Sequence, residues 1–210
     1  MLSFNYMSSF FLKIHNAQRV INYIYVQFQT MKKILTLLIL TFVLTACDGP
    51  YIFNRMITQK DGTKMLIGGV DESAFLKKPF SDWYSKEMDS YHTNSEMIKD
   101  FKGKLKRYRI EVFMGTWCED SQREYPRLMK ILKEAKFPET RMVTYAVNES
   151  KKSFYGEDEG KDIRFVPTII FYRNGKEAAR IVESPVSGSL EEDILMIVKE
   201  MPLTPNYSED

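Results

Sequence analysis

The pattern of apolar and polar positions changes its period along the second half of the chain, which predicts a mixed α/β domain. Short apolar runs typical of strands lie at residues 65–67, 110–114, 141–147, 168–172 and 178–182. Apolar residues spaced three and four apart predict helices that begin after Asn94, Cys118 and Ser189. The aromatic-rich residues 71–92 are interpreted as loop and a short helix. The order β-α-β-α-β-β-α indicates a central mixed sheet covered by helices.

Several local signals refine this pattern. Asn174-Gly175 between two apolar runs predicts a β-hairpin, because both residues tolerate the positive φ angles of a tight turn. Ser189 followed by Glu192 is a capping box that opens the last helix. Gly68-Gly69 predicts a turn, and the charged residues 149–161 predict a solvated loop or a frayed helix. Arg123 and Glu124 are interpreted as solvated helix residues without a catalytic role.

The N-terminal part of the chain carries a targeting signal. Met31-Lys32-Lys33 is followed by an almost uninterrupted apolar run over 34–44 and then by Thr45-Ala46-Cys47. A basic start, a short apolar run and small residues before a cleavage point are typical of a secretory signal peptide. The run is too short for a permanent membrane span, which needs about 20 residues.

Leu44-Thr45-Ala46-Cys47 resembles the lipobox of bacterial lipoproteins. The resemblance implies that Cys47 receives a lipid and becomes the N-terminus, so that acyl chains hold a domain of the cell envelope on a membrane. The alternative is an ordinary signal peptide with an incidental cysteine. Residues 1–30 precede this complete signal and contain no acidic residue, and we expect translation to start at Met31. The alternative is a genuine extension whose aromatic residues touch the membrane.

Composition excludes several classes of function. The chain has 30 Lys and Arg against 28 Asp and Glu, but residues 1–46 hold four basic residues and no acid, which leaves the rest at a formal charge of −2. Without a basic excess, a nucleic-acid partner is not expected. Two cysteines and two histidines predict neither a disulfide framework nor a metal site, and no cofactor motif is present.

The candidate chemistry lies in Trp117-Cys118-Glu119-Asp120-Ser121, between an apolar strand and an amphipathic helix. A cysteine at a helix N-terminus lies near unpaired N–H groups and the positive end of the helix dipole, which favour the nucleophilic thiolate. The negative charges of Glu119 and Asp120 oppose its ionisation, so the two effects have opposite signs. Ser121 could donate a hydrogen bond to the Cys118 sulfur or cap the backbone locally.

This region resembles the active site of thioredoxins. Residues 112–118 match the strand that leads to the active-site cysteine, and Pro126 matches the proline that bends the following helix. Val166-Pro167-Thr168 resembles the loop whose proline is cis and faces that cysteine. The resemblance implies a thioredoxin-like fold, with Trp117 shaping the substrate-facing surface. The predicted segments are an upstream extension at 1–30, a signal peptide at 31–46, a tether at 47–64, an N-terminal extension of the fold at 65–103, a thioredoxin-like domain at 104–201 and a tail at 202–210.

Two departures from the thioredoxin pattern affect function. Thioredoxins use a second cysteine to resolve the mixed disulfide, and here that position is Ser121. The buried acid that assists proton transfer in the family is replaced by Val112. We therefore expect monothiol exchange with protein or small-molecule thiols and disulfides, in which Cys118 attacks and an external thiol resolves. The alternative is a non-catalytic binding or scaffold module. A dyad of Cys118 with His92 has no support in the spacing.

Overall fold

The computed structural model describes residues 24–36 and 51–206. Residues 24–36 are helical and belong to an N-terminal unit, and the chain from Ile52 onward forms a second unit. Within these two described ranges, no helix is both long enough and apolar enough to cross a membrane. Cys47 and most of the apolar run at 34–44 lie outside the described residues.

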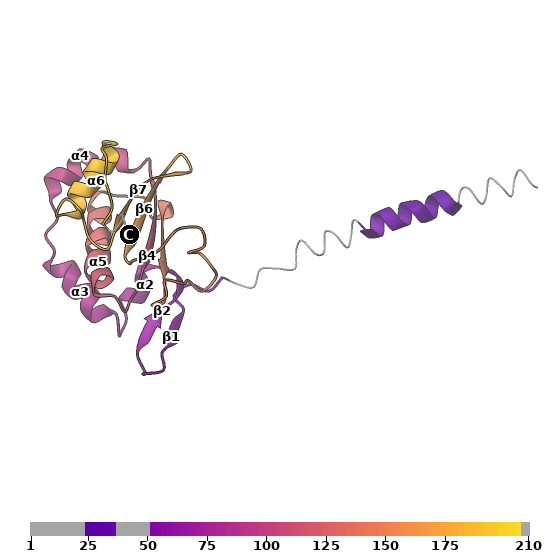
Figure 1. Ribbon diagram of the computed structural model, residues 1–210, viewed down its shortest axis with the longest axis horizontal. Coiled ribbons are helices and arrows are strands. Elements are labelled where there is room, and N and C mark those ends of the chain that lie inside the picture. The colour runs from indigo at the N-terminus through magenta and orange to yellow at the C-terminus, as the bar shows by residue number, and fades with distance from the viewer. Residues whose placement is uncertain (1–23, 37–50, 207–210) are drawn as a thin grey trace, which may run out of the picture. The chain divides into compact units, whose positions relative to one another are not determined.

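A five-stranded mixed sheet organises the second unit (Figure 1). Its strand order is β3-β5-β4-β6-β7, and β4 pairs in parallel with β5 while the other neighbours are antiparallel. The bounds are β3 Gly68–Val70, β4 Arg109–Met114, β5 Met142–Ala146, β6 Thr168–Arg173 and β7 Lys176–Val182. A separate hairpin of β1, Met56–Thr58, and β2, Lys64–Leu66, precedes the sheet.

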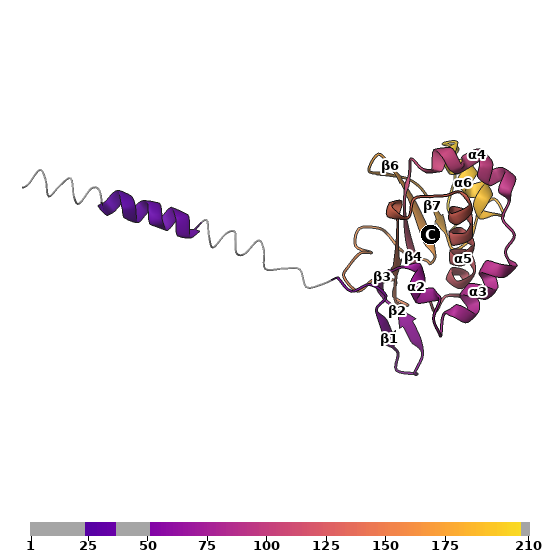
Figure 2. The same ribbon diagram turned by 180° about the vertical axis from the view of Figure 1, so that it is seen from behind.

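The helices gather on one face of this sheet, as both views show (Figures 1 and 2). They are α2 Glu72–Phe75, α3 Ser81–Ser90, α4 Ser95–Leu105, α5 Glu119–Glu134 and α6 Leu190–Val198, and a 3₁₀ turn spans Glu139–Arg141. Alternate residues of β4, such as Ile110 and Val112, are buried against the apolar faces of the helices in the main core. This burial explains the apolar residues at alternate positions of a strand that also contains Arg109 and Glu111.

The opposite face of the sheet carries a smaller apolar cluster and no helix of the described residues. Its buried members are Phe113, Val147, Val166 and Ile170. The long segment between β5 and β6 supplies part of this cluster and occupies the face where a helix could otherwise lie. It is the solvated loop that the charged sequence of residues 149–161 predicts, since no helix or strand forms there. The sheet is therefore covered unequally, by helices on one side and by this loop on the other.

The local signals in the sequence are largely confirmed. Asn94 caps α4, with its side chain accepting a hydrogen bond from the Met97 N–H, and Ser189 caps α6 in the same way from Glu192. Asn174 and Gly175 have φ angles of 52° and 78° and connect β6 to β7. These features depend on neighbouring residues alone, so a sequence pattern is enough to predict them.

Gly68 and Gly69, which the sequence predicts as a turn, lie instead in strand β3. They pair with Ala146 and Tyr145 of β5, which lie more than 70 residues further along the chain. Gly68 has a φ of 84°, in the left-handed region that favours glycine, whereas a Cβ added there would meet the Phe154 Cβ at 3.4 Å, an ordinary contact. The backbone conformation of this edge strand, and not a lack of space, therefore favours glycine at position 68. Residues 56–58, which the sequence interpretation leaves in the tether, form β1.

The sequence predicts that Glu124 is a solvated residue of α5, but the structure shows that it is buried. It is 2% exposed, and one of its carboxylate oxygens, Oε2, has no hydrogen-bond partner. The other oxygen accepts hydrogen bonds from Arg123 at 2.7 Å and from Arg127 at 3.4 Å. Burial raises the pKa of Glu124, and the two arginines offset this effect only in part.

We predict that Glu124→Gln removes a pH dependence of stability. With a folded-state pKa above that of the unfolded chain, the unfolded chain loses its proton first as the pH rises. The free energy of unfolding then falls as the pH rises above about 4.5, the ordinary glutamate value. Urea denaturation between about pH 4 and pH 8 should show that the free energy of unfolding of the wild type, relative to that of Glu124→Gln, falls as the pH rises.

The matched control is Glu96→Gln, which changes a glutamate whose side chain is 84% exposed on α4. This variant should keep the pH profile of the wild type. If the free energy of unfolding varied with pH in the same way in the wild type and in Glu124→Gln, the buried carboxylate would not be the cause of the pH dependence.

Candidate functional site

The candidate site forms where β4 ends and α5 begins. Cys118 is the N-cap residue of α5, with extended backbone angles of −92° and 125°. Its N–H donates a hydrogen bond to the Gly115 carbonyl at 3.0 Å, which closes a tight turn after the strand. A buried central strand and a helix with an apolar face thus hold the cysteine at the helix N-terminus, as the sequence predicts.

The Cys118 sulfur faces the segment that precedes β6. Its side chain is half-buried and packs beside the small cluster of Phe113, Val147, Val166 and Ile170. The thiol donates a hydrogen bond to the Val166 carbonyl oxygen, with Sγ and O 3.1 Å apart. Cys118 is a free thiol, and it is neither deeply buried nor fully exposed. Such partial exposure leaves the sulfur open to a reactant.

The Val166–Pro167 peptide bond is cis, the isomer that the sequence predicts. Val166, Pro167 and Thr168 are all buried. The Thr168 hydroxyl donates to the Phe165 carbonyl at 2.7 Å, and the Pro167 carbonyl accepts from the Glu183 N–H at 2.8 Å. Because the side chains of this loop point inward, a molecule at the site can meet the loop mainly through its backbone.

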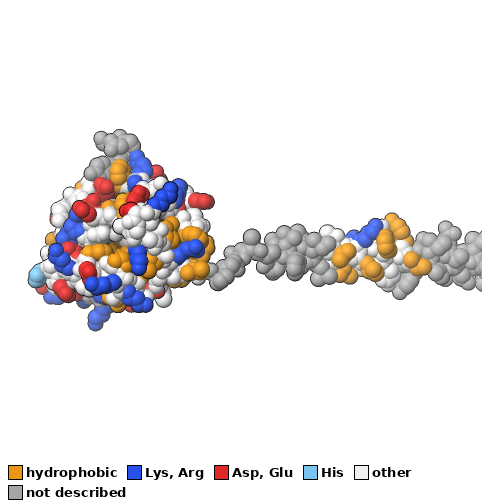
Figure 3. Space-filling model, turned by 90° about the horizontal axis from the view of Figure 1, so that it is seen from below, with side chains coloured by type: hydrophobic (Ala, Val, Ile, Leu, Met, Phe, Trp, Pro, Cys, Tyr) orange, Lys and Arg blue, Asp and Glu red, His pale blue; other side chains and the backbone are white. Residues whose placement is uncertain are grey.

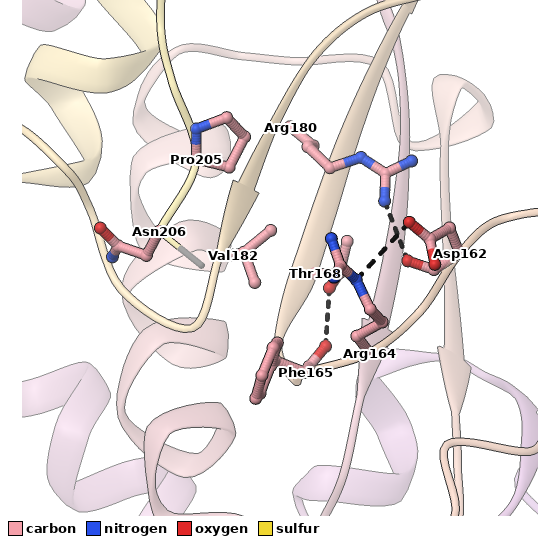
Figure 4. Close-up of a pocket in the computed structure, with 8 residues that line it drawn as sticks. All are labelled: Asp162, Arg164, Phe165, Thr168, Arg180, Val182, Pro205 and Asn206. Atoms are coloured by element: carbon pink, nitrogen blue, oxygen red, sulfur yellow. Dashed lines mark hydrogen bonds and ion pairs between the residues drawn. The ribbon is translucent and has the colours of Figure 1, made fainter. Parts of the chain in front are cut away.

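A small pocket of about 130 Å³ lies next to this loop (Figure 4). Thr168 lines it from β6, and Arg180 and Val182 line it from β7. The Arg180 guanidinium donates to the carbonyl oxygens of Lys161 and Asp162, both at 3.1 Å, and pairs with Glu177. Arg180 therefore ties the loop before the cis-proline to the edge of the sheet.

Ser121 occupies the position at which the thioredoxin resemblance places the resolving cysteine. It is fully buried, and its hydroxyl accepts a hydrogen bond from the Gly115 N–H at 3.1 Å. Of the two roles that the sequence left open, the structure shows the contact with the backbone. Val112, at the position of the family's buried acid, lies in the main core on the helix-covered face of the sheet.

Trp117 lies across the turn that precedes the cysteine. Its indole Nε1–H donates to the Val147 carbonyl at 2.9 Å, and Lys151 lies over the ring at 5.9 Å. A Cβ on Gly115 would come within 2.6 Å of the indole, so the ring requires a glycine there. The indole thus fixes the turn from one side while Ser121 fixes it from the other.

The acidic residues after Cys118 differ in their surroundings. Glu119 is exposed, whereas Asp120 pairs with Arg123 at 2.6 Å, so the charge of Asp120 is compensated locally. His92 is exposed on the segment between α3 and α4, and none of the described contacts joins it to Cys118. In the part of the chain that the structure describes, no group of His, Cys, Asp and Glu has the arrangement of a metal site.

Gln122 and Thr116 support the turn before Cys118, and the sequence does not predict this role. The Gln122 side chain donates to the Thr116 carbonyl at 2.8 Å, and the Thr116 hydroxyl accepts from the Leu66 N–H at 3.2 Å. These bonds connect the turn before Cys118 to α5 and to β2. Their residue types are common in helices and turns, so no sequence pattern distinguishes them.

No family model matches the chain, and no curated protein does. Among solved structures, it is similar to a protein of unknown function from Pseudomonas aeruginosa, with 16% identity, a TM-score of 0.45 and coverage of 62% of this chain and 92% of that chain. Thioredoxin f2 from Chlamydomonas reinhardtii matches with 22% identity, a TM-score of 0.33 and coverage of 51% and 94%. An HIV epitope scaffold matches with 13% identity, a TM-score of 0.34 and coverage of 59% and 99%.

In the described residues, the helices cover one face of the mixed sheet. Within that arrangement, the structure brings Trp117, Cys118, Ser121 and the cis-proline loop together.

We predict that Ser121→Ala lowers the free energy of unfolding by about 1–3 kcal/mol, the cost of leaving a buried N–H without an acceptor. The donor that loses its partner is the Gly115 N–H. Urea denaturation at neutral pH measures the change. As a control, Ser90→Ala removes an exposed hydroxyl at the end of α3 and should change the stability by less than about 0.5 kcal/mol. Equal effects of the two variants would contradict the role of Ser121.

Proposed function

We propose that this protein is a lipid-anchored component of the bacterial cell envelope that exchanges thiols and disulfides through a single nucleophilic cysteine, Cys118. The observation that carries the proposal is the placement of the Cys118 sulfur. It is half-exposed at the N-terminus of α5, 3.1 Å from the Val166 carbonyl that precedes the cis-proline. The chemistry of a thiol at this position, rather than any likeness to a solved structure, supports the assignment.

The first step is attack on a disulfide. Cys118 loses its proton to solvent, and the thiolate attacks one sulfur of a substrate disulfide. A new bond forms between Cys118 and that sulfur, and the other half of the substrate leaves as a thiolate. The hydrogen bond from Cys118 to Val166 exists only while the thiol is protonated, so ionisation frees the Val166 carbonyl at the moment the sulfur becomes reactive.

The second step requires a thiol from another molecule. Ser121 has a hydroxyl in place of the second thiol, and this hydroxyl is buried and engaged with Gly115. An external thiolate therefore attacks the mixed disulfide and releases Cys118 as a thiolate. The result is a disulfide between the substrate and the external thiol, and the enzyme returns to its starting state.

The remaining site residues support these steps through position. Trp117 covers the turn and offers an aromatic surface beside the sulfur. In this proposal the loop at 166–168 holds an extended substrate chain through backbone pairing, as the thioredoxin resemblance implies. Cys47 carries the lipid in this proposal, and no nucleic acid, metal or cofactor is required.

Turnover of a disulfide-linked peptide in an excess of a small thiol tests the exchange. We expect the wild type to accelerate the reaction and Cys118→Ser to abolish the acceleration completely, because no other thiol can form the mixed disulfide. Cys47→Ser in the full chain should retain the activity, since this cysteine only anchors the protein. Iodoacetamide should label Cys118 in the same preparation at a rate that increases with pH.

If iodoacetamide labels Cys118 slowly and no turnover is seen, the proposal is contradicted. That result would favour the alternative, a binding or scaffold module that keeps the cis-proline loop and has no redox cycle. Turnover that survives Cys118→Ser would place the chemistry elsewhere in the chain.

We also predict that Ser121→Cys creates an internal disulfide with Cys118. Residue 121 lies three positions after the N-cap, on the buried side of the first turn of α5. Oxidised Ser121→Cys should show no free thiol at position 118 or 121 and a mass lower by two hydrogens. Gln122→Cys is the matched control, because the Gln122 side chain is directed to the Thr116 carbonyl. Free thiols in oxidised Ser121→Cys would contradict the thioredoxin-like geometry.

A further inference from the structure

A group of large apolar side chains lies exposed where the second unit begins. Ile52, Phe53, Phe154 and Tyr155 are between 42% and 53% exposed, and we call these four residues the aromatic patch. The patch joins two distant segments, since the Ile52 N–H donates to the Tyr155 hydroxyl at 3.2 Å. The rings of Phe154 and Tyr155 are 4.7 Å apart and perpendicular. Figure 3 shows hydrophobic side chains gathered on one side of the domain, with Lys and Arg among them.

The loop that presents Phe154 and Tyr155 is internally held. Asp158 is buried and accepts hydrogen bonds from the Ser153 N–H at 2.7 Å and from Lys152 at 2.9 Å. The Glu157 carboxylate accepts from the Ser153 hydroxyl at 2.5 Å and from the Tyr155 N–H at 3.0 Å. The two rings are therefore exposed on a fixed loop and not on a freely moving one. Ordered, contiguous apolar surface of this kind is typical of an interaction site.

We propose that the aromatic patch lies in the headgroup region of the phospholipid bilayer that anchors the chain, an inference that rests on the lipid anchor at Cys47 in the proposed function. Ile52 follows Cys47 by five residues. A fully extended chain of that length spans at most about 18 Å. A lipidated Cys47 thus holds Ile52, and with it the patch, within about 18 Å of the membrane surface.

The chemistry of the patch suits this location. Aromatic side chains with a polar group, such as tyrosine, are enriched at membrane interfaces, and arginine can extend its charge to the headgroups while its stem stays in apolar surroundings. The Arg55 guanidinium lies 3.7 Å from the centroid of the Phe154 ring, so a cation accompanies the exposed rings. A bilayer interface offers apolar surroundings to the rings and phosphate headgroups to the Arg55 guanidinium.

Spin labels in the full, acylated chain test the proposal. The background variant is Cys118→Ser, in which no reactive thiol remains once Cys47 carries its lipid. Into this background we introduce one cysteine, by Ile52→Cys or by Tyr155→Cys, and attach a nitroxide to it. Val186→Cys is the matched control, because Val186 is an apolar residue of similar exposure, 44%, outside the patch. The protein is reconstituted in vesicles of phosphatidylethanolamine and phosphatidylglycerol, and also studied in detergent. Collision rates of the label with oxygen and with a water-soluble nickel chelate report its depth.

In vesicles, we expect labels at 52 and 155 to collide several-fold less with the nickel chelate than the label at 186, and more with oxygen. Equal, water-like collision rates at all three positions on an acylated, vesicle-bound chain would overturn the membrane contact and leave the exchange activity untouched. A singly labelled chain, with its label at 52 or at 155, whose spectrum is broadened in detergent by the same label on another chain would show that a second copy covers the patch, which also overturns the proposal. A chain without acyl mass that stays off the vesicles would overturn the lipid anchor together with the patch.

Discussion

A buried hydrogen bond from the Gly115 N–H to the Ser121 hydroxyl holds the turn between β4 and α5, together with the bonds from the Cys118 N–H to Gly115 and from Gln122 to Thr116. The bond to Ser121 ties the end of the central strand to the first turn of the helix and so helps to fix where Cys118 lies. The Trp117 indole closes the turn from the other side, where only a glycine leaves it room. A hydroxyl that holds the backbone cannot also serve as a resolving thiol. The same residue therefore secures the site and limits its chemistry to one sulfur.

The unequal cover of the sheet determines what surrounds that sulfur. The helices bury one face in a continuous core, while the other face is covered by the segment between β5 and β6. This segment ends in the cis-proline loop at Cys118, and its middle part carries Phe154 and Tyr155 to the surface. The loop thus connects the site that we propose for exchange with the surface that we propose for the membrane.

Sequence predicted the features that depend on local chemistry and missed those that depend on distant partners. The hairpin at Asn174-Gly175 and the position of Cys118 at a helix N-terminus follow from a few neighbouring residues. Gly68 forms a strand because β5 pairs with it, and no nearby residue reveals this. Glu124 is buried although its helix sequence is polar, because α3 packs against α5. The hydrogen-bond partner of the Ser121 hydroxyl could not be predicted, because the sequence allowed either the Cys118 sulfur or the local backbone.

In the proposed function, Cys118 forms a mixed disulfide that the chain cannot resolve by itself. The most direct measurement incubates the acylated protein with an excess of a small disulfide, removes the reagent and follows the intact mass with time. The account predicts one adduct, located on Cys118, that persists after the reagent is removed and disappears only when a thiol is added. The absence of any adduct, or an adduct that disappears without added thiol, would contradict it.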